Sequence, residues 1–165
     1  QLLVLVHQRE RVVHVGHVDR HRARPRPLAI HSLVQRAGAE PVEHPLAEDD
    51  GVGLINASIT HMGILSPQGP QDWHPAPPEV FEAGRKVRSL CEDAGVNPAE
   101  IALRFSLDYP GPDSTLIGVS NLEQLASSLR VLEMSADDEL LKKIDDAIGD
   151  AMDMRWHEGL AENFE

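Results

Sequence analysis

Short apolar runs and amphipathic segments alternate along the chain from residue 51 onward. Val52–Ala57 is an apolar run bounded by glycines, the pattern of a buried parallel strand, and Ser114–Val119 repeats it. The proline-rich stretch 66–78 predicts a long loop after the first strand, and beyond that loop apolar residues recur every three to four positions. The predicted order is strand, helix, helix, strand, helix, helix, which indicates an α/β architecture.

Capping residues mark the ends of the first two helices. One helix is predicted over Pro78–Ala94, and Gly95 ends it because glycine favours the position after a helix. Asn97 is then the N-cap of a second helix, since a proline and an alanine follow it and a glutamate occupies the third helical position. This second helix is predicted to run to about Tyr109.

Two further helices are predicted toward the C-terminus. Ser120 or Asn121 caps the third, and Ser-Ala-Asp-Asp over 135–138 caps the fourth. The polar tail from Asp150 is predicted to be loosely held. The residues expected to form the apolar stripes of the four helices are Phe81, Val87, Leu90, Cys91 and Ala94; Ile101, Ala102 and Phe105; Leu122, Leu125, Leu129 and Leu132; and Leu140, Leu141, Ile144, Ala147 and Ile148.

The first fifty residues follow a different pattern. Leu2–Val6 and Arg11–Val18 alternate weakly and are predicted to pair as strands. Arg-Pro-Arg-Pro over 24–27 interrupts any regular element, because proline lacks the N–H that helices and sheets use. Beyond it, Leu28–Gln35 is predicted to form a short helix.

Composition separates the same two regions. Residues 1–50 hold six of the nine histidines and seven arginines but no lysine and no aromatic residue, and seven acidic residues make this region neutral. Residues 51–165 carry eight basic and twenty acidic residues, so the whole net charge of −12 lies there. This acidic balance is evidence against nucleic acid or an anionic membrane surface as a partner.

Length and cysteine content narrow the class further. The 165 residues suffice for one domain with a core but fall short of the roughly 250 of a complete (β/α)8 barrel. No stretch has the run of about 20 apolar residues that a membrane span needs, and residues 1–6 lack the features of a signal peptide. The single cysteine, Cys91, is predicted to be buried and suits a reducing, cytoplasmic setting.

Three motifs in order resemble the aldo-keto reductase family. They are Gly-Val-Gly-Leu-Ile-Asn-Ala-Ser over 51–58, His-Met-Gly-Ile-Leu-Ser over 61–66, and Ser-Thr-Leu-Ile-Gly-Val-Ser-Asn-Leu-Glu-Gln-Leu over 114–125. The loop Gln-Gly-Pro-Gln-Asp-Trp-His-Pro over 68–75 is most similar to the branch of L-galactose and aldose 1-dehydrogenases. The resemblance implies a partial TIM (β/α)8 barrel, made of the last two strand–helix units and a C-terminal helix.

The resemblance also implies where a nicotinamide dinucleotide would bind. Ser58 and Thr60 match the positions that contact the cofactor pyrophosphate, although the family's usual Ser-Pro-Leu reads Ser-Ile-Thr here. The adenosine-phosphate corner, at the start of the last barrel helix, matches Gly118, Val119 and Ser120. The remaining matched positions are Gln124 and Ser128.

The same positions favour NAD over NADP. Relatives that prefer NADP carry Lys or Arg where this chain has Gly118, and Arg where it has Gln124. A guanidinium grips a 2′-phosphate through paired, charge-assisted bonds, and neither position offers one. Ser128 stands where many relatives place an adenine-binding Asn.

No catalytic residue is assigned. The family's Asp, Tyr, Lys and His tetrad comes from earlier strands, whereas the first lysine here is Lys86 and the only tyrosine is Tyr109, both after the strand at 52–57. The predicted organisation is therefore an atypical segment 1–50 that is not native family sequence, a partial barrel over 51–149, and a polar tail over 150–165. The chain is interpreted as part of an NAD(P)-dependent oxidoreductase for an aldose or another carbonyl or alcohol substrate, inactive alone.

Two alternatives stay open. In the first, the chain is a non-catalytic truncated isoform that binds a nucleotide or a partner. In the second, the N-terminal histidines at 7, 14, 17, 21 and 31 form a metal-binding module. Metal binding is the less favoured of these, because no cysteine or well-placed carboxylate completes a ligand pattern. His61 and His74 are interpreted as surface or loop histidines, and Trp73 either lines a substrate mouth or packs over the barrel rim.

Overall fold

The computed structural model describes residues 54–109 and 112–152 with Met154 and Trp156, and the backbone of three strands within residues 1–50. The elements are β1 (Leu2–His7), β2 (Val12–His17), β3 (Ile30–His31), β4 (Ile55–Asn56), α2 (Pro78–Asp93), α3 (Pro98–Asp108), β5 (Ser114–Val119), α4 (Leu122–Arg130), the 3₁₀ turn η1 (Val131–Glu133), α5 (Asp138–Ile148) and the 3₁₀ turn η2 (Gly149–Ala151).

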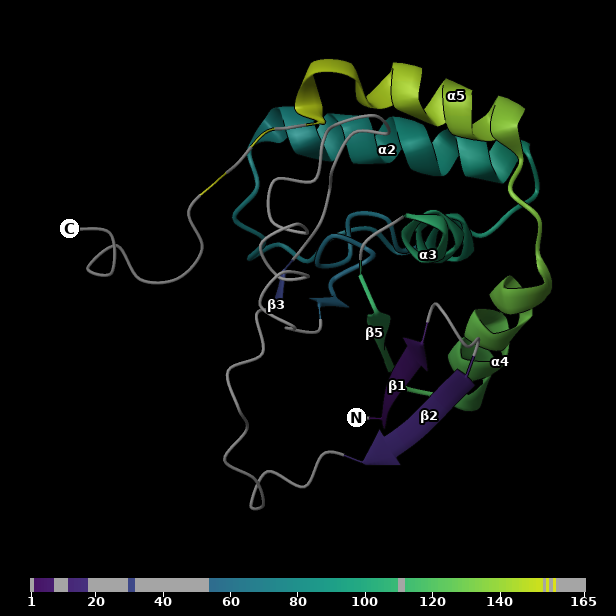
Figure 1. Ribbon diagram of the computed structural model, residues 1–165. Coiled ribbons are helices and arrows are strands. Elements are labelled where there is room, and N and C mark those ends of the chain that lie inside the picture. Colours follow the sequence, from purple (N-terminus) through teal and green to yellow (C-terminus); the bar gives the residue numbers. More distant parts are fainter. Residues whose placement is uncertain are drawn as a thin grey trace, which may run out of the picture.

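Five strands form one mixed sheet in the order β2-β1-β5-β4-β3 (Figure 1). β3, β4 and β5 run parallel, whereas β1 pairs antiparallel with both β2 and β5. The hairpin predicted near the N-terminus is therefore confirmed, and it covers the free edge of β5. The short helix predicted over 28–35 is wrong at Ile30 and His31, which pair with β4. A short apolar run fits either element, and a neighbouring strand decides between them.

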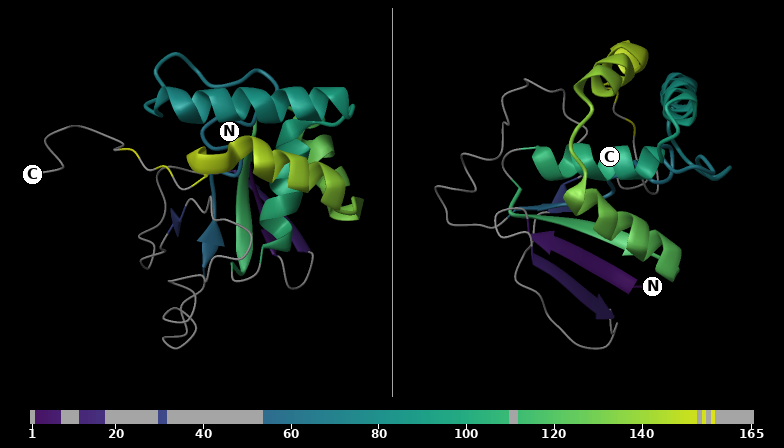
Figure 2. Two further views of the ribbon diagram at one scale, coloured as in Figure 1. Left: turned by 90° about the horizontal axis from the view of Figure 1, so that it is seen from above. Right: turned by 90° about the vertical axis from the view of Figure 1, so that its right-hand side faces the viewer.

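The helices form two layers over one face of the sheet. Leu103 of α3 packs with Ile117 and Val119 of β5 and Val131 of η1, so α3 and η1 lie directly on β5. A second cluster joins α2 to α5. Figure 2 shows the pair α2 and α5 outside α3, with the sheet on the other side of α3.

Side-chain caps start three of these helices as the sequence predicts. The side-chain oxygen of Asn97 accepts from the Ala99 N–H at 2.9 Å, that of Asn121 from the Gln124 N–H at 2.8 Å, and that of Asp137 from the Leu140 N–H at 3.0 Å. Each cap satisfies an N–H that the first helical turn leaves without a partner. The helix bounds consequently fall within a residue or two of those predicted.

Several side chains expected in the core are exposed instead. In α4, Leu122 is 82% exposed and Leu129 is 40% exposed, while Ala94 lies on the surface after α2. Leu103, which the predicted stripe omits, is only 1% exposed. The period of a helix defines an apolar stripe, but the neighbouring elements decide how much of it is covered. In α4 only the edge of the stripe that faces β5 and α3 is partly buried.

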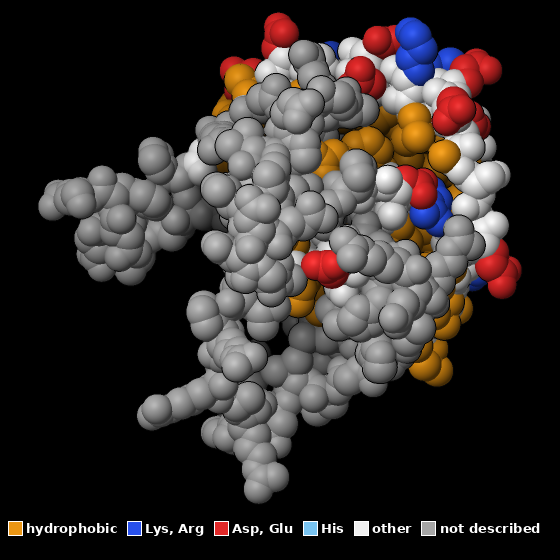
Figure 3. Space-filling view, in the orientation of Figure 1, with side chains coloured by type: hydrophobic (Ala, Val, Ile, Leu, Met, Phe, Trp, Pro, Cys, Tyr) orange, Lys and Arg blue, Asp and Glu red, His pale blue; other side chains and the backbone are white. Residues whose placement is uncertain are grey.

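The architecture contains the two strand–helix units expected for the end of a barrel. β4 leads into α2 and α3, β5 leads into α4, and α5 follows. The sheet is nevertheless open, since an antiparallel hairpin continues it beyond β5 where a (β/α)8 barrel would have a parallel strand. The fold is thus part of a barrel wall rather than a closed barrel. Asp and Glu side chains are spread along the outer rim of its helical side (Figure 3).

Candidate cofactor-binding site

Two of the segments matched to cofactor contacts follow neighbouring parallel strands of the sheet. β4 and β5 are parallel, with Ile55 opposite Ser114 and Asn56 opposite Thr115. The chain therefore leaves β4 toward Ser58 on the same side as it leaves β5 toward Ser120. The carboxyl ends of parallel strands are where ligands bind in α/β folds. Parallel pairing thus directs two segments about sixty residues apart toward the same side of the sheet.

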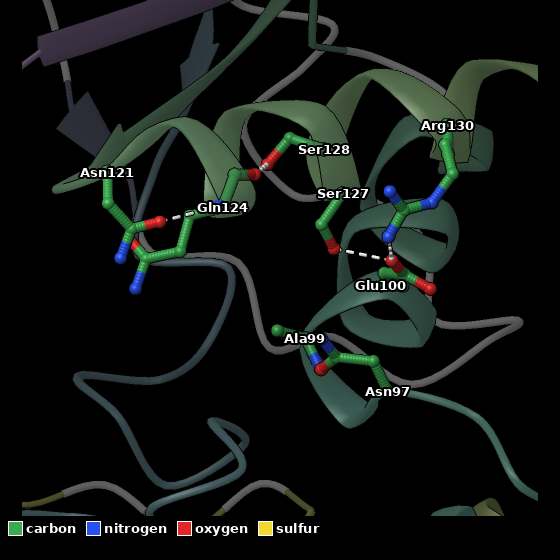
Figure 4. A network of polar contacts seen from close by, with 8 residues as sticks. All are labelled: Asn97, Ala99, Glu100, Asn121, Gln124, Ser127, Ser128 and Arg130. Atoms are coloured by element: carbon green, nitrogen blue, oxygen red, sulfur yellow. Dashed lines mark hydrogen bonds and ion pairs between the residues drawn. The ribbon is translucent and has the colours of Figure 1, made fainter.

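At the end of β5, hydrogen bonds organise the first turn of α4 (Figure 4). The Gln124 side-chain oxygen Oε1 accepts from the Ser120 N–H at 2.8 Å and from the Ser120 hydroxyl at 2.9 Å. Asn121 Oδ1 in turn accepts from the Gln124 N–H. Gln124 thus folds back over the turn and presents a neutral amide there.

The other predicted residues of this corner differ in what they present. Gly118 is exposed, but the Val119 side chain is only 4% exposed and packs in the core, so only its backbone can face a ligand. The Ser128 hydroxyl donates to the Gln124 carbonyl at 2.9 Å and is half-buried. Arg130 lies at the far end of α4 (Figure 4), where it pairs with Glu100 at 3.0 Å.

After β4 the chain makes a tight loop over residues 58–66. Ser58, His61 and Met62 have positive φ angles of 58°, 53° and 54°. These angles lie in the left-handed region, which residues other than glycine seldom occupy. The Thr60 carbonyl accepts from the N–H groups of Gly63 at 3.1 Å and Leu65 at 3.0 Å, which closes the loop on itself.

The loop offers open donors at its beginning. The Ser58 side chain is exposed, and Thr60 is half-buried. Within the part of the chain that the structure describes, no hydrogen bond uses the N–H groups of Ser58, Ile59 and Thr60. Backbone N–H groups and hydroxyls are suitable partners for the oxygens of a pyrophosphate. The donor set of Ser58–Thr60 therefore fits the oxygens of a dinucleotide pyrophosphate.

Two side chains outside the predicted cofactor site, His74 and Arg88, bind carbonyl groups of this loop. His74 is 6% exposed, and its Nε2 contacts the His61 carbonyl at 3.2 Å. Arg88 of α2 donates through Nη1 to the Ile64 carbonyl. His74 is a loop residue, as expected, but it is buried rather than on the surface. No sequence period points to either contact, because both join segments far apart in the chain.

An aromatic cluster surrounds the loop. Trp156 lies edge-on to His61 with ring centroids 4.9 Å apart, and His74 packs against Trp156 and Phe81 at 5.9 and 5.4 Å. Trp73 stacks on His74 but stays 67% exposed. Burial, and after it the electrostatic influence of His74, lowers the pKa of His61 below its ordinary value. At neutral pH the cluster is therefore uncharged at His61.

Other functional classes find limited support among the described residues. They contain no group of three or more His, Cys, Asp or Glu side chains arranged to hold a metal ion. The histidines at 7, 14, 17, 21 and 31 lie outside the residues whose side chains are described, so a metal module there stays a prediction. In the described part of the chain, no helix is long and apolar enough to span a membrane. Cys91 is fully buried, as predicted.

The family model described as Aldo/keto reductase family matches residues 30–148. The match covers more than half of the 165 residues, and the chain belongs to the aldo-keto reductase family. It begins at residue 30, inside the segment 1–50 that composition sets apart.

Curated relatives include several sugar or aldehyde dehydrogenases. L-galactose dehydrogenase of Arabidopsis thaliana is 30% identical over 123 residues, which are 72% of this chain and 39% of that protein. Pyridoxal 4-dehydrogenase of Microbacterium luteolum is 32% identical over 99 residues, 58% of this chain and 29% of that protein. D-arabinose 1-dehydrogenase of Saccharomyces cerevisiae is 30% identical over 77 residues, which are 46% of this chain and 23% of that protein. The chain thus spans less than half the length of these relatives.

Among solved structures, a glycerol dehydrogenase from Gluconobacter oxydans superposes with a TM-score of 0.49 at 19% identity, over 71% of this chain and 40% of that chain.

Proposed function

We propose that this chain supplies part of the nicotinamide dinucleotide site of an oxidoreductase that acts on an aldose or another small carbonyl or alcohol substrate. One observation carries the proposal: in a member of this family, the open donors of the loop 58–60 and the corner 118–120 lie at the carboxyl ends of two paired parallel strands. The sugar class is supported by the dehydrogenases among the relatives, which act on L-galactose and D-arabinose.

In this proposal each segment has a separate task. Ser58 and Thr60, with the N–H groups of the loop, hold the pyrophosphate. Gly118, Ser120 and the backbone of Val119 face the adenosine half, bordered by Gln124 and Ser128. The nicotinamide, when bound, supplies the hydride chemistry, and no residue of this chain is proposed to transfer a proton. A cytoplasmic location is part of the proposal, supported by the buried free thiol of Cys91.

The cofactor is proposed to be NAD rather than NADP. Gln124 uses its side-chain oxygen to hold Ser120, and its neutral amide lacks the charge and the paired donors through which a guanidinium would bind a 2′-phosphate. Gly118 brings no charge, and Arg130, at the opposite end of α4, pairs with Glu100. The net charge of −12 further disfavours the extra dianion.

The test is a titration of the 165-residue chain with NAD and NADP, followed by fluorescence or calorimetry. We expect NAD to bind more tightly, and the double variant Gly118→Lys with Gln124→Arg to shift the preference toward NADP by about tenfold or more. Gln124→Ala is the matched control, because it removes the amide without adding a charge. Failure of the wild type to bind either dinucleotide would argue against the site and favour the interaction-protein alternative.

A further inference from the structure

The loop 58–66 is held in a conformation that costs free energy. Three of its residues other than glycine, Ser58, His61 and Met62, occupy the left-handed region. Each such residue costs conformational free energy and persists only where the surroundings impose it. Strain of this kind concentrates at ligand clamps and active sites, so the contacts that impose it identify residues that support a site.

His74 supplies one of these contacts. Its Nδ1 accepts from the Ala76 N–H at 3.1 Å, so the ring proton lies on Nε2, which donates to the His61 carbonyl at 3.2 Å. The ring is buried and packs against Phe81 and Trp156. The bond therefore fixes the peptide that follows one of the left-handed residues.

Arg88 supplies the second contact from helix α2. Its Nη1 donates to the Ile64 carbonyl, and its guanidinium covers Gly69, where an added Cβ would come within 3.3 Å of it. Burial, and then the charge of Arg85, lowers the pKa of Arg88, although an arginine stays protonated at neutral pH. No carboxylate in the described part of the chain pairs with it. A charged donor aimed at a carbonyl forms a stronger bond than a neutral one.

We infer that His74 and Arg88 are positioning residues, which hold the carbonyls of His61 and Ile64 and so present the donors of Ser58–Thr60 in a preformed arrangement. This inference rests on the proposed function, because it assigns these donors to a pyrophosphate. Donors that are fixed before binding lose less freedom when the ligand arrives. The clamp that His74 and Arg88 form on the loop therefore raises the affinity for the ligand without touching it.

The experiment compares NAD with adenosine, which lacks the pyrophosphate. His74→Phe keeps an aromatic ring but removes the bond to His61, and Arg88→Gln removes the charged donor. Both are expected to weaken NAD binding about five- to tenfold and to leave adenosine binding, followed by NMR, unchanged. Arg85→Gln is the control, because Arg85 is exposed on the same helix and pairs with Glu82. Unchanged NAD affinity, or an equal loss for both ligands, would overturn the inference.

Amide hydrogen exchange gives an independent measure of the clamp. We expect faster exchange at the N–H groups of Gly63 to Ser66 in both variants, with β5 and α3 unchanged. If the wild type binds no NAD, the proposed function fails by itself. Faster exchange in that case still supports the hold on the loop, whereas unchanged exchange overturns it.

Discussion

Individual residues matter most where backbones or rings come closest. Gly84 of α2 is buried directly under the loop 58–66, and a Cβ built there would lie 2.2 Å from the Cγ2 atom of Ile64. Ile64 itself is only 2% exposed and packs with Ala76 and Val80. A helix normally prefers alanine to glycine, so glycine at this position reflects the close approach of the loop rather than helix propensity.

Gly84→Ala is accordingly expected to destabilise the fold. The overlap with Ile64 should cost about 1–3 kcal/mol, more than the roughly 1 kcal/mol that alanine gains in a helix. The measurement is the free energy of unfolding from a urea titration. In the double variant Gly84→Ala with Ile64→Ala, the loss of unfolding free energy should be smaller than the sum of the losses in the two single variants, because the second change removes the clashing methyl group. Simple additivity would contradict the close contact.

His61 should make stability depend on pH. Its pKa in the folded state lies below the ordinary value of 6.5, mainly through burial, so the unfolded chain takes up a proton more readily than the folded chain. The contribution of neutral His61 to the free energy of unfolding is therefore complete above about 6.5, the pKa in the unfolded chain. It is lost as the pH falls from there through the lower pKa of the folded state.

Urea titrations at about pH 7.5 and about pH 5.5 measure this effect. The wild type should be less stable at the lower pH. His61→Asn, which tolerates a positive φ angle but does not titrate, should show a smaller difference between the two pH values. An equal difference in the two proteins would mean that other groups account for the pH dependence.

At the scale of elements, polar contacts fix the angle between α3 and α4. Glu100 near the start of α3 accepts through Oε1 from the Ser127 hydroxyl and from Arg130, while Arg104 donates to the Val131 carbonyl at 3.1 Å (Figure 4 shows the Glu100 contacts). The Glu100 side chain is 15% exposed, whereas that of Arg130 is 63% exposed. The Ser127 bond is consequently the shielded one, and the Arg130 pair is open to solvent.

Ser127→Ala and Arg130→Ala should therefore differ. Loss of the Ser127 bond leaves a largely buried carboxylate short of one donor and should cost about 1.5–3 kcal/mol of unfolding free energy. Loss of the exposed Arg130 pair should cost less than about 1 kcal/mol. Thermal or urea unfolding of the two variants side by side checks the order, and the reverse order would show that Arg130 carries the contact.

Capping and periodicity made most of the elements predictable at this scale. Asn97, Asn121 and Asp137 mark helix starts through bonds to N–H groups two or three residues away, and such local chemistry is readable from neighbouring letters. The exposure of Leu122 and Leu129 was not predictable, since it depends on whether another element covers α4.

At the scale of the whole molecule, the N-terminal hairpin completes the sheet. β1 lies between β2 and β5, with Val4 opposite both Val15 and Ile117. The N–H groups of such a strand point alternately to its two neighbours. A proline in β1 therefore removes a ladder bond and leaves the edge of β5 open for association with other chains.

Val4→Pro is expected to lower the free energy of unfolding by about 1–3 kcal/mol and to promote self-association. Val4→Thr is the control, because it keeps a branched side chain suited to a strand. Light scattering over a range of protein concentrations measures the association, alongside urea unfolding. A monomeric, equally stable proline variant would show that β1 does not protect β5.

Local chemistry in the sequence determined the strands of the hairpin, the caps and bounds of the helices, the buried Cys91, and the order of motifs that identifies the family. These depend on side-chain period and on bonds between near neighbours. Only the tertiary structure decided that β1 runs antiparallel to β5, that Ile30 and His31 form a strand, and that His74 and Arg88 hold the loop after β4. Each of these depends on a contact between distant segments, and such contacts form where strands pair or side chains pack, a choice that no single segment encodes.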